Sequence, residues 1–554
     1  MKRYLFIMSL IALLGACAKK EGKFDRADGT AAITVASLEN HLKILASDAF
    51  MGRMPFTEGE QKTIAYLQEQ FKNLGLESGN GSSYLQEVPM VEITTTAAPV
   101  MEVKSAKKKF TLEGLKDYVI WTQRTDPTTE VKDTELVFAG FGIVAPEYNW
   151  NDYEGLDVKD KVVVVLVNDP GFGAEDVSLF KGNTMTYYGR WTYKFEEAAR
   201  QGARGILIIH DDVPAGYGFW VVQNSWNASK LYLDTRGKDL YFSAFTGWVS
   251  QPAAKKLFEE AGIDWASTVS AARKPGFKAV PMKLSITTSL VVKAKYDKSH
   301  NVIGKITGAK QPDEYIIYST HWDHLGIGKP DEKGDTIYNG ALDNASGTAG
   351  MLELIKAFKN MENKPNRTVV FLAVTAEEQG LYGSEYYAQN PVYPREKTVA
   401  NINMDGINPY GRMKDIVVVG IGQSDLEDYL DAEAKAVGRY TSPEPNPVAG
   451  YYFRSDHFNF AKVGIPALYT NTGIDHHEKG ADYGKQLQDE YVSKYYHKPS
   501  DEYDTSRWNL EGAAEDLQLL FNVGKKLAFE TSWPQWKKGS EFKSTREQYM
   551  PKVN

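Results

Sequence analysis

The sequence predicts an α/β fold, and two observations carry this prediction. Apolar runs of strand length alternate with helical patterns through the second half of the chain. A helix is expected over residues 346–358, because Met351, Leu354 and Phe358 recur on one face. Near-continuous apolar strands separated by helices indicate a sheet that helices cover on both faces. The strands are expected at residues 301–306, 314–320, 368–374, 399–404, 415–419 and 466–470.

Length and composition are those of a soluble globular protein with more than one domain. The chain has 554 residues, of which 42% are hydrophobic and 25% are charged. The formal net charge of -8 and a pI near 5.8 give no basic surface. We therefore expect no nucleic-acid partner.

Residues 1–16 have the features of a cleaved export signal. Lys2 and Arg3 precede an apolar run that is too short to span a bilayer. The letters LGAC at 14–17 resemble the lipobox of bacterial lipoproteins, in which cleavage precedes a cysteine that is then acylated. We expect an exported bacterial lipoprotein, anchored to the lipid bilayer through Cys17 on the periplasmic or extracellular side. An ordinary cleaved signal is the alternative.

The segments after the signal are predicted to form two domains. A capping box is expected at TEGE, residues 57–60, where Ile64, Leu67 and Phe71 follow at helical spacing and Gly75 ends the helix. The predicted segments are a linker over 17–34, a main domain formed by 35–90 and 293–530, an insertion over 91–292 and a C-terminal tail over 531–554.

The insertion is predicted to be rich in β-strands. Strands at residues 161–167 and 205–210 flank a helix at 195–203 that closes on glycine. This order resembles the protease-associated domain that many peptidases carry. Its large aromatic residues either line a substrate groove or fill a core, and the core is favoured because large aromatics are mostly buried. These residues are Tyr187, Trp191, Trp220 and Trp226.

Clusters of histidine and acidic residues follow the predicted strands. His321 follows one strand, Glu377 and Glu378 follow the next, and Asp405 ends the third. In open α/β sheets the binding crevice lies beyond the carboxyl ends of the strands. Asp343 precedes the helix at 346–358, where an acidic residue often only caps it. The clusters are HWDHLG at 321–326, NGALDNASG at 339–347, TAEEQG at 375–380 and NINMDG at 401–406.

Taken together, the acidic residues of these clusters predict a pair of metal ions. Singly, two adjacent glutamates are usually solvated and an aspartate at a strand end is usually a turn residue. Four carboxylates that converge on one crevice require protons or cations to offset their repulsion and desolvation. Two divalent ions supply that charge, and imidazole with carboxylate ligands suits zinc. We expect two Zn²⁺ per chain.

The motif series resembles the cocatalytic di-zinc aminopeptidases of metallopeptidase family twenty-eight, and it continues at YHKPSD, residues 496–501. The resemblance implies a three-layer sandwich with a mixed, mainly parallel central sheet and an inserted protease-associated domain. It also implies that His321 and Asp405 bind one zinc, Glu378 and His497 bind the other, and Asp343 bridges the two.

The same resemblance assigns roles to residues beside the metals. Asp323 is expected to orient His321, and Glu377 to act as the general base on a bridging water. Tyr496 is a weaker candidate for a hydrogen bond to the tetrahedral oxyanion. Four further histidines are expected to be structural or to hydrogen-bond to ligands, with substrate contact by one of them as the alternative: His324, His457, His476 and His477.

The implied activity is hydrolysis of the N-terminal peptide bond of peptides with a free N-terminus. A glutamate-carboxypeptidase-like dipeptidase is the alternative, and a receptor-like homologue without activity is a more distant one. A glutaminyl cyclase is disfavoured by the full ligand set. Cys17 is the only cysteine, which excludes a cysteine nucleophile, and Ser455-Asp456-His457 lacks the G-x-S-x-G elbow of serine hydrolases.

Overall fold

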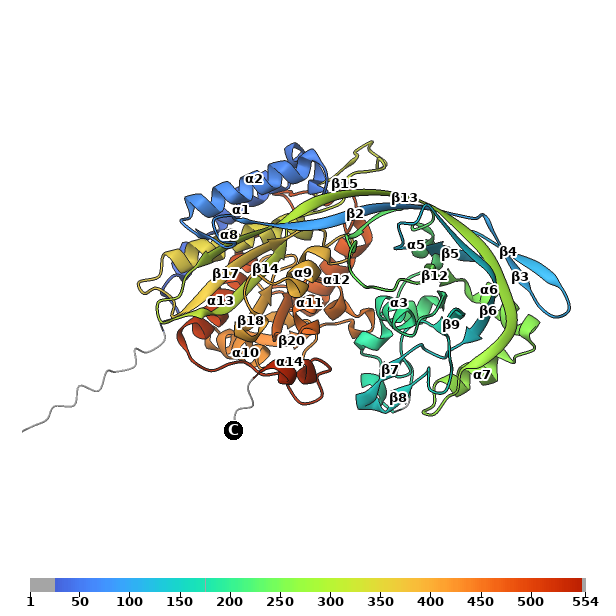
Figure 1. Cartoon of the computed structure of the whole chain (residues 1–554). Helices are drawn as coiled ribbons and strands as arrows, with labels where there is room; N and C mark the ends of the chain where they lie inside the picture. Colours follow the sequence, from blue (N-terminus) through green and yellow to red (C-terminus); the bar gives the residue numbers. More distant parts are fainter. Residues whose placement is uncertain (1–24, 175, 551–554) are drawn as a thin grey trace, which may run out of the picture.

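Two lobes share two long strands in the computed structural model, which describes residues 25–174 and 176–550 (Figure 1). These strands, β2 (Leu85–Ala97) and β13 (Val280–Ile306), run along both lobes. They pair antiparallel from Leu85 opposite Val302 to Ala97 opposite Leu290. Cys17 and the predicted export signal lie outside the described residues.

The predicted ends of the insertion, residues 91 and 292, fall inside β2 and β13. Both lobes therefore belong to one continuous hydrogen-bonded ladder. This connection differs from the flexible linkers that usually join domains.

The first lobe is built on a mixed sheet whose central strands are parallel. β14 (Gln311–His321) lies between β17 (Arg367–Val374) and β18 (Thr398–Asn403), and both pairings are parallel. β21 (Ala467–Asn471) extends the parallel part beside β18. The predicted α/β class with a mixed, mainly parallel sheet is confirmed. The outer strands are the end of β13 and β1 (Glu77–Ser78) at one edge, and β19 (Asp415–Val418) and β20 (Tyr440–Pro443) at the other.

Helices cover both faces of this sheet and make three layers. Side chains of a strand alternate between its faces, so Ile316 joins a buried cluster on one side and Ile317 one on the other. The first face packs against α1 (Val35–Leu45), α2 (Glu58–Asn73), α8 (Gly347–Lys359), α10 (Leu426–Ala436) and α13 (Glu511–Phe529), and the second against α9 (Tyr382–Gln389) and α11 (His457–Lys462).

The start of α2 differs from the predicted capping box. Thr57 is the N-cap, but its hydroxyl accepts from the N–H of Gly59, one residue earlier than in a capping box. The Glu60 carboxylate accepts from the N–H of Phe56 at 2.6 Å and not from that of Thr57. The capping-box prediction is therefore wrong in its partners, although the helix begins where it was expected.

The second lobe contains a parallel core of its own. β9 (Val162–Leu166) lies between β6 (Thr128–Phe138) and β10 (Gly205–Ile209), and β12 (Phe245–Val249) follows β10 in parallel. β6 pairs antiparallel with β13, which connects this core to the first lobe. The other elements are β3 (Val100–Lys104), β4 (Lys109–Glu113), β5 (Tyr118–Trp121), β11 (Ser229–Leu233), α3 (Trp191–Arg200), α4 (Asp212–Ala215), α5 (Phe219–Gln223), α6 (Gln251–Ala261) and α7 (Trp265–Ala272).

Three of the four aromatic residues that the sequence singled out pack against buried clusters of this lobe. Tyr187, Trp191 and Trp226 are partly buried there. Trp220 is 67% exposed, so the core prediction is wrong for that residue. It lies on the short helix α5, which presents it to solvent.

The two lobes also touch beyond the shared strands. The Tyr187 ring lies 6.1 Å from that of Phe453 and 5.0 Å from that of Phe458. Lys462 forms an ion pair with Glu196 at 3.3 Å. The second lobe is therefore held against the segment of residues 451–462, which comes from the first lobe.

Across residues 25–174 and 176–550, no helix has the length and apolar character that a membrane crossing requires.

Candidate metal centre

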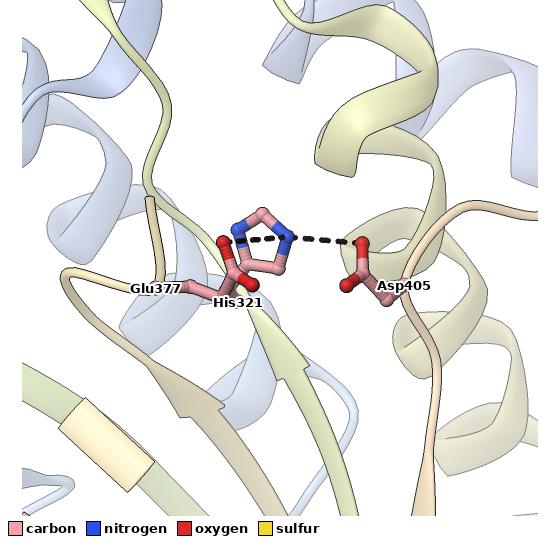
Figure 2. A group of neighbouring side chains, drawn as sticks. All are labelled: His321, Glu377 and Asp405. Atoms are coloured by element: carbon pink, nitrogen blue, oxygen red, sulfur yellow. Dashed lines mark hydrogen bonds and ion pairs between the residues drawn. The ribbon is translucent and has the colours of Figure 1, made fainter. Parts of the chain in front are cut away.

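Three predicted site residues meet at the carboxyl ends of the parallel strands (Figure 2). His321 is the last residue of β14, Glu377 follows β17, and Asp405 follows β18. His321 Nε2 lies 3.1 Å from Asp405 Oδ1 and 3.9 Å from Glu377 Oε2. Their positions follow from strand register, because His321 stands opposite Val374 at the end of the neighbouring strand.

Asp343 lies between the two predicted metal positions. Its Oδ1 is 3.3 Å from His321 Nε2, and its Oδ2 is 3.2 Å from His497 Nε2. His497 Nε2 is in turn 3.1 Å from Glu378 Oε2. One carboxylate oxygen thus faces each histidine, which is the arrangement expected of a carboxylate that bridges two ions.

The donor atoms fit a pair of zinc ions. Two groups place their ligand atoms within 4.8 Å of one another: His321, Glu377 and Asp405, and His324, Asp343 and Glu378. The Nε2 atom of His324 is buried and has no hydrogen-bond partner, whereas His497 Nε2 is close to the carboxylates of Asp343 and Glu378 only. Buried imidazole nitrogens are normally satisfied, so unpartnered nitrogens among carboxylates suit metal binding.

Asp323 holds the loop that carries the two glutamates. Its buried carboxylate accepts from the backbone N–H groups of Glu377 at 3.1 Å and Glu378 at 3.4 Å. It lies 3.7 Å from His321 Nδ1, whereas the backbone carbonyl of Asp323 lies 3.2 Å from the same nitrogen. Burial raises the pKa of Asp323 to about 8. Asp323 therefore positions both the histidine and the glutamates.

The electrostatics of the centre are those of a buried, acid-rich cluster. Burial raises the pKa of Glu377 well above its usual range, and the charges of Asp405 and Glu378 raise it further. Burial opposes the charged form of His321, but the carboxylates of Glu377 and Asp405 outweigh it and raise the pKa of this imidazole. Without metal ions these groups depend on shared protons for neutrality.

His324 lies closer to the centre than the sequence indicated. Its Nδ1 is 2.5 Å from Glu378 Oε1, and its ring is 5.8 Å from that of His497. A hydrogen bond to a ligand is the role predicted for it. The structure adds that it belongs to the second group of potential ligands. The spacing of three residues between His321 and His324 in HWDH is the sequence feature that could have indicated this position.

The remaining candidate residues are not among the predicted metal ligands. Tyr496 stacks on the His497 ring at 3.8 Å between centroids and is 42% exposed. His457 is buried, and burial lowers its pKa to about 3. His476 accepts backbone N–H groups of Glu478 and Lys479 through Nδ1, as a structural histidine does. With His477 it lines a cavity of about 700 Å³ next to Leu342.

Arg53, which sequence reasoning missed, lies beneath the metal centre. The guanidinium is 1% exposed and donates to four backbone carbonyls. The acceptors are those of Trp322 (2.9 Å), Leu45 (2.8 Å), Asn339 (2.6 Å) and Gly340 (3.0 Å). Burial lowers its pKa to about 10, while Asp323 and other site carboxylates favour its charge. Arg53 thus joins both ends of the segment between β14 and Asp343, at Trp322 and at Asn339–Gly340, to the last residue of helix α1.

Arg53→Met should lower the free energy of unfolding by about 3–5 kcal/mol, because several buried carbonyls lose their donor. Urea denaturation of the zinc-loaded protein measures this change. Arg412→Met, which removes a largely exposed guanidinium paired with Glu515 in the same lobe, is the control and should change stability little. A loss below about 1 kcal/mol for Arg53→Met would contradict this role.

Comparison with known proteins identifies the family of the segment that contains most of these residues. Residues 301–521 match the family described as Peptidase family M28. The chain carries a peptidase M28 domain. This domain contains His321, Asp343, Glu377, Asp405 and His497, whereas Arg53 contributes from outside it.

Several curated relatives resemble parts of the chain. The Caenorhabditis briggsae glutamate carboxypeptidase 2 homolog is 38% identical over 435 residues, covering 67% of this chain and 51% of the relative. Aminopeptidase NAALADL1 of Rattus norvegicus is 32% identical over 315 residues, covering 49% and 38%. A probable zinc metalloprotease of Pyrenophora tritici-repentis is 24% identical over 270 residues, covering 47% and 56%. The chain spans less than two thirds of the length of these relatives.

Among solved structures, the aminopeptidase from Aneurinibacillus sp. strain AM-1 is 20% identical, with a TM-score of 0.49. The similarity covers 92% of this chain and 97% of that chain.

Proposed function

We propose that this protein is a zinc-dependent exopeptidase that removes N-terminal residues from peptides. The observation that carries the proposal is the position of Asp343, whose two oxygens face His321 and His497 while Glu377 lies beside the first of these histidines. The M28 domain and the zinc metalloprotease relatives support it.

The residues present fit two zinc ions. His321 and Asp405 would hold one, Glu378 and His497 the other, and Asp343 both. Bound zinc would supply Lewis acidity to the scissile carbonyl and to a water molecule. Glu377 takes the proton of that water and delivers it to the leaving amine, as its buried carboxylate at the edge of the ligand set suits. The site carboxylates hold the α-ammonium of the substrate, and the phenol of Tyr496, a residue that is 42% exposed, donates to the oxyanion.

The proposal extends to the rest of the chain. Residues 91–292 would be a protease-associated domain, in keeping with the order of β9, α3 and β10. Cys17 would be acylated and anchor an exported lipoprotein to the membrane, as the LGAC letters at 14–17 indicate.

A glutamate-carboxypeptidase-like dipeptidase is the second candidate, and the Caenorhabditis briggsae relative favours it. The two candidates share the metal centre and differ in what the substrate must present. An aminopeptidase needs a free α-amine, whereas a carboxypeptidase needs a free carboxylate at the leaving residue. A receptor-like protein without activity is disfavoured because all the expected ligands are present.

Zinc analysis with paired substrates tests this function. We expect about two zinc ions per chain and cleavage of aminoacyl anilides with a free amine, with no cleavage of the N-acetylated forms. Cleavage of N-acetylated dipeptides instead would select the carboxypeptidase. Full zinc occupancy without hydrolysis of any of these substrates would overturn the enzymatic proposal.

A further inference from the structure

Asp501 accepts hydrogen bonds from three consecutive backbone N–H groups, the last of which belongs to the proposed bridging ligand. Its carbonyl oxygen accepts from Ala341 at 3.0 Å. Its carboxylate accepts from Leu342 at 3.2 Å through Oδ1 and from Asp343 at 3.3 Å through Oδ2. Asp501 is only 2% exposed. One buried residue therefore satisfies three neighbouring donors of the segment that carries Asp343.

Asp501 also ends the turn that carries His497, a proposed ligand of the second zinc ion. The N–H of Asp501 donates to the carbonyl of Lys498 at 3.0 Å, which closes this turn. The backbone of His497 is left-handed, with φ at 57°. A residue with a side chain keeps such a conformation only where the surrounding structure imposes it. The position of His497 therefore depends on contacts made by the rest of its turn.

Tyr491 of α12 (Gly480–Lys494) contacts both ends of this turn. Its hydroxyl donates to Asp501 Oδ2 at 3.1 Å. Its carbonyl accepts the N–H of Tyr496 at 2.9 Å, and the Tyr496 ring stacks on that of His497 with centroids 3.8 Å apart. The beginning and the end of the turn are thus tied to one helical residue.

The partners of Asp501 differ from those of an aspartate that only stabilises its own turn. Asp504 is an example of the ordinary case, since it accepts the N–H of Ser506 two residues later at 2.8 Å. The carboxylate of Asp501 instead joins the turn of His497 to the distant segment of Asp343. We call these hydrogen bonds the Asp501 clamp. Across the clamp, His497 Nε2 lies 3.2 Å from Asp343 Oδ2.

We propose that Asp501 is a positioning residue that sets the distance between His497 and Asp343 and so forms the second zinc position. This inference rests on the proposed two-zinc peptidase function and concerns a residue outside its ligand set. The first position depends less on the clamp, because His321 and Asp405 are held by the ends of β14 and β18. Loss of Asp501 should therefore weaken one ion more than the other.

A cavity of about 700 Å³ lies against the clamp and makes a chemical rescue feasible. Leu342, Tyr491 and Asp501 are among the residues that line it. Removal of the Asp501 carboxylate would join the space that it occupies to this cavity. Formate is the smallest carboxylate, and from there it can accept the two N–H groups that the substitution leaves without an acceptor.

Zinc binding by Asp501→Ala tests the proposal. Competition with a chromophoric chelator should show that the second ion binds about 10- to 100-fold more weakly, while the first stays within about threefold of the wild-type value. Asp501→Asn keeps one acceptor oxygen and Tyr491→Phe keeps both, so their losses should be smaller. Glu502→Ala removes the exposed carboxylate of the next residue, and this control should bind both ions normally.

Formate distinguishes positioning from a general loss of structure. It should restore the second ion in Asp501→Ala and leave the wild-type protein unchanged. Equal weakening of both ions without recovery in formate would make Asp501 a structural residue and overturn the proposal. Circular dichroism identifies a variant that does not fold. If Asp501→Ala fails in this way, normal binding of both ions by Asp501→Asn and Tyr491→Phe would overturn the proposal.

Hydrogen exchange in the zinc-free protein tests the clamp without metal or activity. The amides of residues 341–343 should exchange at least about 10-fold faster in Asp501→Ala than in Glu502→Ala, because their acceptors are lost. Unchanged protection would overturn the clamp. A wild-type protein that shows this protection and binds two zinc ions, yet cleaves no peptide, would retain the positioning role and overturn the proposed peptidase function.

Discussion

Glu377→Gln is expected to lower kcat by about 10²- to 10⁴-fold while zinc content stays near two ions per chain. Of the three carboxylates within 4 Å of His321 Nε2, Glu377 is the farthest, at 3.9 Å, compared with 3.1 Å for Asp405 and 3.3 Å for Asp343. It is therefore the carboxylate of this group that is least suited to bind the same ion as His321. Glutamine preserves its shape and cannot accept the proton.

Steady-state kinetics on a free aminoacyl anilide, with zinc measured by mass spectrometry on the same sample, checks this result. Glu396→Gln makes the same chemical change at an exposed position of the M28 domain and serves as the control. Turnover close to that of the wild-type protein would remove Glu377 from the role of base. Loss of a zinc ion together with activity would identify it as a ligand instead.

The positions of the acidic and histidine residues at strand ends could be predicted because they depend on local patterns. Apolar runs locate the strands, and parallel strands in register bring their carboxyl ends to one edge. His321 and Asp405 meet for this reason, with β14 and β18 as neighbours. The resemblance supplied what register cannot, namely that the distant His497 approaches Asp343.

Arg53 could not be predicted, because its partners are backbone carbonyls distant in sequence. The backbone of Arg53 has a left-handed conformation, with φ at 51°. A sequence pattern does not indicate this conformation for an arginine. Three of its four acceptors belong to residues 322–340. Every residue has a carbonyl, so no residue type marks these acceptors. A buried arginine of this kind becomes visible only when the loops are placed in space.

The length of β13 could not be predicted either, because its burial pattern changes along the strand. Its burial alternates within the second lobe, where one face is solvated, and becomes nearly continuous from Val302 to Gly304 in the central sheet. The sequence analysis interpreted this change in hydrophobic pattern as the boundary of an insertion. In the structure, the predicted boundary lies within one strand that passes through two packing environments.

Asp343→Ala is expected to abolish binding of both zinc ions and all measurable hydrolysis. One oxygen of Asp343 faces His321 and the other faces His497, so the substitution removes a ligand atom from each predicted position. Of the proposed ligands it leaves two side chains at each position, His321 with Asp405 and Glu378 with His497, and His324 is expected to keep its hydrogen bond to Glu378. A catalytic zinc site generally needs three. Zinc analysis after dialysis measures the loss.

His497→Ala is the matched comparison, since it removes a ligand atom from one position only. We expect this variant to retain one ion, held by His321, Asp405 and Asp343. The stability of the protein should follow the same order, because an ion that binds only the folded state stabilises it by about 4 kcal/mol at a thousandfold excess over its Kd. Zinc should therefore raise the melting temperature of the wild-type protein most, that of His497→Ala less, and that of Asp343→Ala hardly at all. Two retained ions in Asp343→Ala would exclude the bridging role, whereas equal losses in the two variants would mean that neither ion binds without the other.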